Sequence, residues 1–293
     1  MIDPQQQWCI QIDVTNQCAR RCSNCTRALA HANRRWHMTP NQFRLACRAL
    51  RDFPTQSVPD LQGRKKVVGM IGGEPLLHPH FDFLCDIMTQ EIPDRDRRGL
   101  WTSIHWEKRR EAWRIRETFG YVNQNPHAEQ KPSVHQPLLV AIADAIPCAE
   151  TREKLIDACW VQRIWSSTIN RRGFYFCEVA AALSDIFAGP DGLPVEPDCW
   201  RRPLSDFRYQ RDWACQRCGC AIPLPPRVDA EERDDVSKSN LEALKRIGSR
   251  GVDRCVLFDT DHYDPQQYWT GWEPNRYLKN APWPYHKIER KDT

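Results

Sequence analysis

Three cysteines lie close together near the beginning of the chain, at Cys18, Cys22 and Cys25, with the spacing Cys-x3-Cys-x2-Cys. One loop can therefore offer three thiolates, with no fourth ligand nearby. Three protein ligands on a four-iron cluster leave one iron open, and an open iron can chelate a small molecule. The alternatives are chance clustering and a zinc knuckle, although structural zinc sites normally have four protein ligands.

A second candidate feature is the segment Gly72, Gly73, Glu74 and Pro75, which follows the apolar residues 67–71. Glycine allows a backbone to approach a ligand closely, and the carboxylate of Glu74 can pair with an ammonium group. A Gly-Gly turn after a strand is on its own usually only a turn. Its combination with the cysteine loop is more informative, since both features follow predicted strands.

This combination resembles the radical SAM superfamily. The resemblance implies that Cys18, Cys22 and Cys25 bind a 4Fe-4S cluster, whose open iron takes the amino and carboxylate groups of S-adenosylmethionine. It also implies that the Gly-Gly-Glu-Pro segment holds the amino group of the methionine moiety.

Two further residues are candidates for contact with the cofactor. The family commonly has an aromatic residue before the third cysteine, in contact with adenine, whereas this chain has Asn24 at that position. Ser103 follows the third predicted strand and could meet the ribose or the carboxylate. A buried capping serine is the alternative interpretation of Ser103.

A second set of cysteines lies in the later part of the chain and resembles the twitch or SPASM extension of radical SAM enzymes. In that pattern a cysteine is followed by a glycine and then by another cysteine, which here are Cys159, Gly173 and Cys177. Three residues separate Gly173 from Cys177, whereas the family has four. The resemblance implies an auxiliary 4Fe-4S cluster held by Cys159, Cys177, Cys215 and Cys218. The alternative is a zinc ribbon formed by Cys199, Cys215, Cys218 and Cys220.

Apolar segments with strand and helix periods alternate along the first half of the chain. This alternation predicts an α/β protein with parallel strands, whose working face lies at the carboxyl ends of the strands. We expect a partial (β/α)6 TIM-type barrel with a small cysteine-rich C-terminal extension. The predicted strands are residues 8–14, 65–71, 100–104 and 162–169, and the predicted helices are residues 40–50, 80–90, 107–118, 150–159 and 179–187.

The domain organisation follows from the same pattern. We predict that residues 1–155 form the first half of the barrel and that residues 156–220 form its end together with the auxiliary-cluster region. Residues 221–293 are then a linker and a C-terminal tail, since residues 221–238 are rich in proline and then in charge.

Composition bounds the class of protein. The chain has 293 residues, of which 27% are charged, and no run approaches the roughly 18 apolar residues that a membrane helix needs. The first ten residues contain no positive region followed by an apolar stretch, so we expect no signal peptide there. We therefore expect a cytoplasmic protein with no membrane partner. Its fourteen cysteines would be reduced there, which favours metal ligation over disulfides.

The resemblance implies reductive cleavage of S-adenosylmethionine to a 5'-deoxyadenosyl radical, with flavodoxin or ferredoxin as electron donor. Residues 174–179 and 215–219 are similar to segments of small phage-encoded radical SAM proteins. Some of those proteins act in thymidine hypermodification and rearrange an amino acid attached to the base. Our leading hypothesis is therefore an isomerase that acts on a modified thymidine in DNA.

Arginine pairs could bind the phosphate backbone of such a substrate, although solvated charge is their ordinary role. Two other functions stay open at this point. One is modification of a peptide by a radical SAM maturase, and the other is a non-catalytic iron-sulfur or zinc module that binds nucleic acid. No residue is assigned as a catalytic acid or base. The arginine pairs are residues 20–21, 34–35, 109–110, 171–172 and 201–202.

Overall fold

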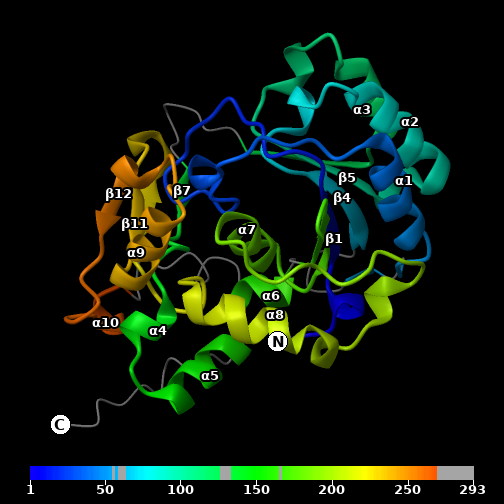
Figure 1. Ribbon diagram of the computed structural model, residues 1–293. Helices are drawn as coiled ribbons and strands as arrows, with labels where there is room; N and C mark the ends of the chain where they lie inside the picture. The colour runs from blue at the N-terminus through cyan, green and yellow to red at the C-terminus, as the bar shows by residue number, and fades with distance from the viewer. Residues whose placement is uncertain (55–56, 59–63, 126–132, 165–166, 269–293) are drawn as a thin grey trace.

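The computed structural model describes residues 1–54, 57–58, 64–125, 133–164 and 167–268. Figure 1 shows a central sheet with helices on its outer side, a helix at the centre of the molecule, and a small C-terminal unit on the other side of that helix.

The sheet has six strands, which are β1 (Cys9–Asp13), β4 (Val67–Ile71), β5 (Arg98–Thr102), β6 (Tyr121–Gln124), β8 (Thr168–Asn170) and β9 (Gly173–Tyr175). Their order across the sheet is β6-β5-β4-β1-β8-β9. Neighbouring strands from β6 to β8 pair in parallel, whereas β9 runs antiparallel to β8. Only two residues separate β8 from β9, which permits a hairpin but no parallel crossover.

The predicted α/β class is confirmed. In the described part of the chain the sheet is open, with β6 and β9 at its edges, so the partial barrel stays a prediction. All five residues of β1 are buried. This is typical of a parallel strand that is covered on both faces.

Three helices cover the outer face of the sheet, namely α1 (Pro40–Ala49), α2 (Phe81–Glu91) and α3 (Ala112–Thr118) (Figure 1). In sequence order, each helix packs against the next. The start of α1 matches the prediction because Pro40 stands in its first turn and Thr39 forms a capping box with Gln42.

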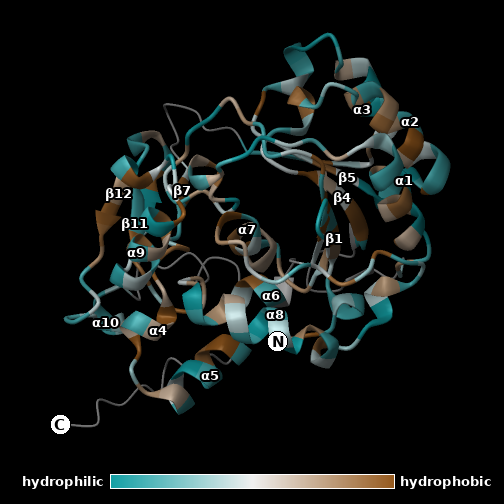
Figure 2. Cartoon of the chain, in the orientation of Figure 1, coloured by the Kyte–Doolittle hydropathy of each residue, from teal (hydrophilic) through white to brown (hydrophobic). Residues whose placement is uncertain are grey.

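The inner face of the sheet meets α7 (Glu178–Ile186), in which eight of nine residues are buried. Figure 1 shows α7 at the centre of the molecule, and most of its residues are apolar (Figure 2), as is typical of a helix that packs inside a protein. The helix α8 (Arg208–Ala214) packs against α7, and α5 (Ala149–Asp157) and α6 (Trp160–Ile164) lie nearby. Among the described helices, none has the length and apolar character needed to cross a membrane.

Two predicted elements begin later than expected. The strand expected over residues 162–169 is wrong in its first part, because α6 continues to Ile164 and β8 begins at Thr168. Short apolar runs fit a helix and a strand equally well, which explains the error. The helix expected over residues 107–118 begins at Ala112, after a 3-10 turn at Trp106–Lys108.

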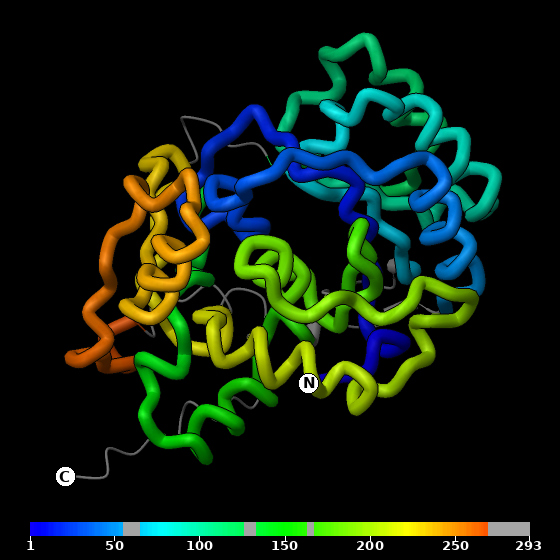
Figure 3. The backbone as a smooth tube through the Cα atoms, in the orientation of Figure 1, coloured from blue at the N-terminus to red at the C-terminus, as the bar shows by residue number. Residues whose placement is uncertain are grey.

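The C-terminal unit contains the parallel pair β11 (Asp234–Val236) and β12 (Cys255–Leu257) with α9 (Lys238–Arg246) between them. Figure 3 shows this yellow and orange segment beside the blue loop that follows β1. The remaining short elements are β2 (Ser57–Val58), β3 (Arg64–Lys65), β7 (Val134–His135), α4 (Ile142–Ala145), β10 (Arg227–Val228) and α10 (Pro265–Tyr268).

Residues 221–238 are not an exposed linker. Ile222, Leu224 and Val236 are fully buried and belong to the same hydrophobic core as the sheet. The prolines and charges of this segment predicted an exposed loop, but Asp234 and Asp235 are buried with polar partners from the N-terminal part of the chain. The rest of the predicted tail, residues 269–293, lies outside the described residues.

A buried group of charges connects the sheet, the cysteine loop and α7. The Nε atom of Arg27 lies 3.1 Å from an oxygen of Asp13, and its Nη2 atom lies 3.0 Å from an oxygen of Glu178. The same Nη2 atom donates a hydrogen bond of 2.6 Å to Gln11. Burial raises the pKa of both carboxyl groups, and the positive charge of Arg27 partly offsets this effect.

We expect Arg27→Ala to lower the free energy of unfolding by about 3–5 kcal/mol, because removal of one partner leaves buried charges uncompensated. Urea denaturation followed by circular dichroism measures this change. Arg109→Ala is the control, since Arg109 forms an exposed pair with Glu111 that contributes about 0–1 kcal/mol. Equal effects of the two substitutions would contradict the role given to Arg27.

Candidate functional site

The predicted site residues of the first half of the chain meet at one edge of the sheet. The cysteine loop follows β1, the Gly-Gly turn follows β4, and Ser103 follows β5. Because these three strands are adjacent and parallel, their carboxyl ends lie side by side.

Backbone hydrogen bonds join the Gly-Gly turn to the cysteine loop. The N–H of Gly73 donates to the carbonyl of Thr15 at 2.7 Å, and the N–H of Glu74 donates to the carbonyl of Gln17 at 2.7 Å. A Cβ atom at Gly73 would lie 2.2 Å from the Gln17 carbonyl oxygen, and one at Gly72 would lie 2.4 Å from that of Thr15. Both glycines are therefore required by the close approach of the two loops.

The three thiols of the first loop influence one another electrostatically. Burial, together with the charges of Cys25 and Glu74, raises the pKa of Cys18 to about 11. Burial raises the pKa of Cys22 to about 12 together with the charges of the neighbouring thiols, among which Cys25 has a larger effect than Cys18. Cys18, Cys22, Cys25 and Glu74 therefore lie close enough to influence one another.

Backbone N–H groups point at the sulfur atoms of this loop. The N–H of Arg20 lies 3.4 Å from the sulfur of Cys18. Burial raises the pKa of Cys25, and backbone hydrogen bonds from Arg27 and Leu29 partly offset that rise. Such donors stabilise a thiolate, and hydrogen bonds to sulfur also tune iron-sulfur clusters, so the loop fits the predicted ligand.

The carboxylate of Glu74 is fully buried and accepts hydrogen bonds from the strand beside it. Thr102 donates to one oxygen at 2.7 Å, and the N–H and hydroxyl of Ser103 donate to the other at 2.8 and 2.9 Å. Pro75 follows as the first residue of a short 3-10 helix. The structure thus brings Glu74 and Ser103 into direct contact, and Ser103 orients the carboxylate.

Asn24 is held by the C-terminal unit. Its N–H donates to Asp234 at 2.7 Å, its side-chain amide donates to Asp235 at 2.9 Å, and its side-chain oxygen accepts from the N–H of Asp235 at 2.8 Å. The residue is buried and has a φ of 49°, a conformation that asparagine tolerates better than most residues. The amide of Asn24 therefore serves to fasten the loop, and the adenine contact stays a prediction.

Sequence reasoning missed the residues of the C-terminal unit that reinforce this attachment. Arg254 donates to the carbonyls of Arg21 and Cys22 at 2.9 and 3.2 Å, and its Nε atom lies 3.2 Å from Asp234. His31 contacts the same carboxylate of Asp234 at 3.3 Å. More than two hundred residues separate most of these partners, so a motif search near the cysteines could not find them.

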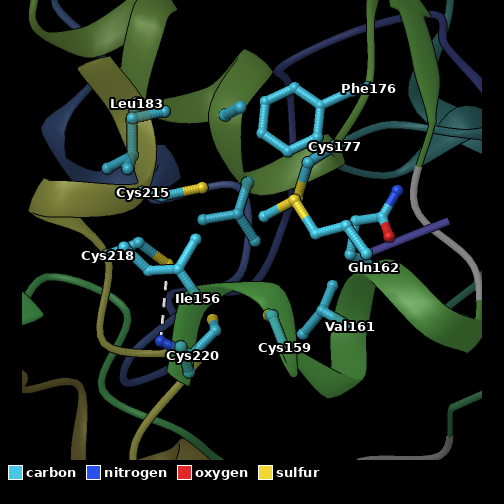
Figure 4. A pocket seen from close by; sticks show the side chains of 15 residues that line it. Ile156, Cys159, Val161, Gln162, Phe176, Cys177, Leu183, Cys215, Cys218 and Cys220 are labelled. Atoms are coloured by element: carbon cyan, nitrogen blue, oxygen red, sulfur yellow. Dashed lines mark hydrogen bonds between the residues drawn. The ribbon is translucent and has the colours of Figure 1, made fainter. Parts of the chain in front are cut away.

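The second set of cysteines lines one cavity between α5, α6, α7 and α8, shown in Figure 4. The cavity contains about 400 Å³ of empty space, counting the part that is open to solvent. Apolar side chains such as Ile156, Phe176 and Leu183 form much of the remaining wall. Five thiols line it, those of Cys159, Cys177, Cys215, Cys218 and Cys220.

These five thiols also influence one another. Burial, together with the charge of Cys218, raises the pKa of Cys159 to about 12. Burial and other cysteines of the cavity also raise the pKa of Cys177 and Cys215. A side-chain hydrogen bond with Cys220 lowers the pKa of Cys218. The N–H of Cys220 also lies 3.4 Å from the sulfur of Cys218. The donor set and the apolar wall therefore fit a buried iron-sulfur cluster.

The zinc alternative requires Cys199, and the structure separates that residue from the others. Cys199 lies in a 3-10 helix outside the cavity, and the charges around it belong to Arg202, Glu196 and Asp198. Cys220, which sequence reasoning assigned only to the zinc site, lines the cavity. In the described ranges no three histidine, cysteine, aspartate or glutamate side chains are arranged to hold a single metal ion.

Comparison with known proteins adds little. No family model matches the chain, and no curated protein matches it. Among solved structures, the chain is similar to the crystal structure of BtrN in complex with AdoMet and 2-DOIA. That likeness has a TM-score of 0.39 and 15% sequence identity, and it covers 73% of this chain and 93% of BtrN. It is too distant to assign a function.

We expect Gly73→Ala to destabilise the protein by about 1–3 kcal/mol, because the new methyl group would force the Gly-Gly turn away from Gln17. Thermal unfolding measures the change. Ala19→Ser is the control, since Ala19 is exposed in the same loop. A melting temperature equal to that of the control would show that the two loops separate without cost.

We also expect Asn24→Ala to cost about 1–3 kcal/mol, because the buried N–H of Asp235 loses its acceptor. Asn33→Ala is a matched control, since Asn33 is exposed and makes one hydrogen bond to the carbonyl of Ile247. The control should change stability by less than about 0.5 kcal/mol. Urea midpoints compare the two variants, and equal midpoints would contradict the fastening role of Asn24.

Proposed function

We propose that this chain is a radical SAM enzyme, which cleaves S-adenosylmethionine reductively and uses the 5'-deoxyadenosyl radical to remove a hydrogen atom from a substrate. One observation carries the proposal. The loop that carries the three cysteines accepts backbone hydrogen bonds from Gly73 and Glu74 of the Gly-Gly turn. Loop and turn both lie at the carboxyl ends of adjacent parallel strands. When bound, a 4Fe-4S cluster supplies one electron, received from flavodoxin or ferredoxin, for the cleavage.

Each residue of this edge has a distinct task in the proposal. Cys18, Cys22 and Cys25 hold the cluster. Glu74 accepts the ammonium group of S-adenosylmethionine, and its carboxylate is already oriented by Thr102 and Ser103. Gly72 and Gly73 keep the turn close to the cysteine loop, which places Glu74 beside Cys18.

An auxiliary 4Fe-4S cluster is the second part of the proposal, with Cys159, Cys177, Cys215 and Cys218 as ligands. The shared cavity and the mutual influence of these thiols support it. Four protein ligands would leave no iron open, and the wall is largely apolar. The arrangement therefore favours electron transfer over substrate binding for this cluster.

The substrate of the proposed reaction is an amino-acid-modified thymidine in DNA, and the reaction is a radical rearrangement. The similarity of residues 174–179 and 215–219 to phage-encoded radical SAM proteins supports this choice. Phe174 and Phe176 of the first segment are buried in the core beside the auxiliary cavity. That segment therefore contributes to the fold of the auxiliary region, and substrate contacts must come from elsewhere.

The test begins with protein purified without oxygen. We expect roughly eight irons per chain, because two 4Fe-4S clusters hold four each. Addition of dithionite and S-adenosylmethionine should yield 5'-deoxyadenosine. Replacement of Cys18, Cys22 and Cys25 by alanine should remove about half of the iron and all of the 5'-deoxyadenosine.

The double variant Cys177→Ala and Cys215→Ala is the matched control. It should also lose about half of the iron, but it should keep S-adenosylmethionine cleavage because the first loop is intact. About four irons in the wild type would remove the auxiliary cluster from the proposal. Zinc without any cleavage would contradict radical chemistry and indicate a non-catalytic binding module.

A further inference from the structure

The structure separates the five arginine pairs into neutralised and free groups. Most of their side chains lie against a carboxylate of a nearby residue. Arg109 and Arg110 share Glu111, Arg171 and Arg172 pair with Asp185 and Asp191, Arg201 and Arg202 pair with Asp198 and Glu196, and Arg21 pairs with Glu232. Exposed arginines with such partners have lost much of their attraction for an added anion.

Arg34 and Arg35 differ from this group. Both are exposed, and no carboxylate in the described part of the chain forms an ion pair with either of them. Arg20 also forms no ion pair with a carboxylate of the described residues. Its guanidinium donates a hydrogen bond to the carbonyl of Ser103 at 3.3 Å. Three positive charges are thus left available for an external anion.

These charges lie beside the proposed active site. The carbonyl of Arg34 accepts from the Asn16 side chain at 2.7 Å, and the N–H of Trp36 donates to the same side chain at 2.8 Å. The segment that carries Arg34 and Arg35 is therefore fixed to the loop between β1 and Cys18. Arg20 belongs to the cysteine loop itself.

A second cavity lies next to the same segment, with both polar and apolar side chains in its wall. It is lined by Asp13, Asn16, Trp36, Gly72 and Asn170, which come from the carboxyl ends of β1, β4 and β8 and the loops that follow them. The cavity contains about 360 Å³ of empty space, counting its open part. Asn16 and Trp36 line this cavity, and Asn16 is also hydrogen-bonded to the backbone of Arg34. The arginine segment therefore lies beside the ends of the strands.

We propose that Arg34, Arg35 and Arg20 bind consecutive phosphates of a DNA strand and so present one of its nucleotides to the site at the strand ends. This inference rests on the proposed function and specifies the surface that receives its substrate. Arginine suits the task because its planar guanidinium binds phosphate oxygens in pairs. Charges on two separate loops match a polymer with repeated phosphates better than a nucleotide with one.

The test measures DNA binding by the anaerobically purified holoenzyme. A short fluorescent DNA duplex containing thymidine is titrated at several salt concentrations, first with wild type and then with the double variant Arg34→Ala and Arg35→Ala. We expect affinity to fall about tenfold or more, and the slope of log K against log salt to decrease in magnitude by about two, one for each lost phosphate contact.

Arg109→Ala with Arg110→Ala is the matched control, since it removes the same number of positive charges from two arginines that already contact the carboxylate of Glu111. Its affinity should change less than about twofold. An equal loss in both double variants, or no loss in either, would overturn the inference, because binding would then follow overall charge. Circular dichroism of each variant excludes unfolding as the cause of a loss.

A second arm replaces the duplex with thymidine monophosphate. Binding as tight as that of DNA would overturn the claim of a polymeric substrate, while much weaker binding supports it. The proposed function is tested separately by 5'-deoxyadenosine formation in the wild type. Specific DNA binding without that product would keep the surface and remove the radical chemistry.

Discussion

The buried ion group of Arg27, Asp13 and Glu178 is the interaction on which the rest of the structure depends. Arg27 is two residues beyond Cys25, Asp13 ends β1, and Glu178 directly follows Cys177. Removal of three charges from water is costly, and their mutual contact and hydrogen bonds such as that from Arg27 to Gln11 offset that cost. The contacts of Arg27 with Asp13 and Glu178 therefore connect both sets of cysteines to the end of β1.

The helix α7 is the wall that separates the two sites. Its residues Val179, Ala180 and Leu183 line the cavity of the five cysteines, and Ala181, Ala182 and Asp185 line the second cavity, at the strand ends. Alanines on both sides keep this wall thin, because they have no side chain beyond Cβ. A short separation favours electron transfer between a buried cluster and chemistry at the strand ends, in line with the role proposed for the auxiliary site.

The C-terminal unit holds the cysteine loop from the other side. Asn24 is hydrogen-bonded to Asp235 of β11, and Arg254 donates hydrogen bonds to the carbonyls of Arg21 and Cys22. These hydrogen bonds stabilise the conformation of the cysteine loop. A loop with three thiols gains little from hydrophobic burial. Its conformation is therefore specified by hydrogen bonds to distant parts of the chain.

The sequence by itself determined the α/β class, the start of α1 and the local motifs at Cys18 to Cys25 and Gly72 to Pro75. These features depend on short-range rules, such as capping, strand periodicity and the need for glycine at close approaches. By resemblance it also named Cys159, Cys177, Cys215 and Cys218 as one ligand set; these four line one cavity, and their role as ligands stays a prediction. Only the tertiary structure decided that Cys220 joins them and Cys199 does not, and that residues 221–238 are partly core. It also showed that Arg109 and Arg110 share Glu111, whereas Arg34 and Arg35 form no ion pair within the part of the chain that the structure describes. Each of these depends on contacts between residues far apart in the chain, and a buried polar group is recognisable only when its distant partner is known.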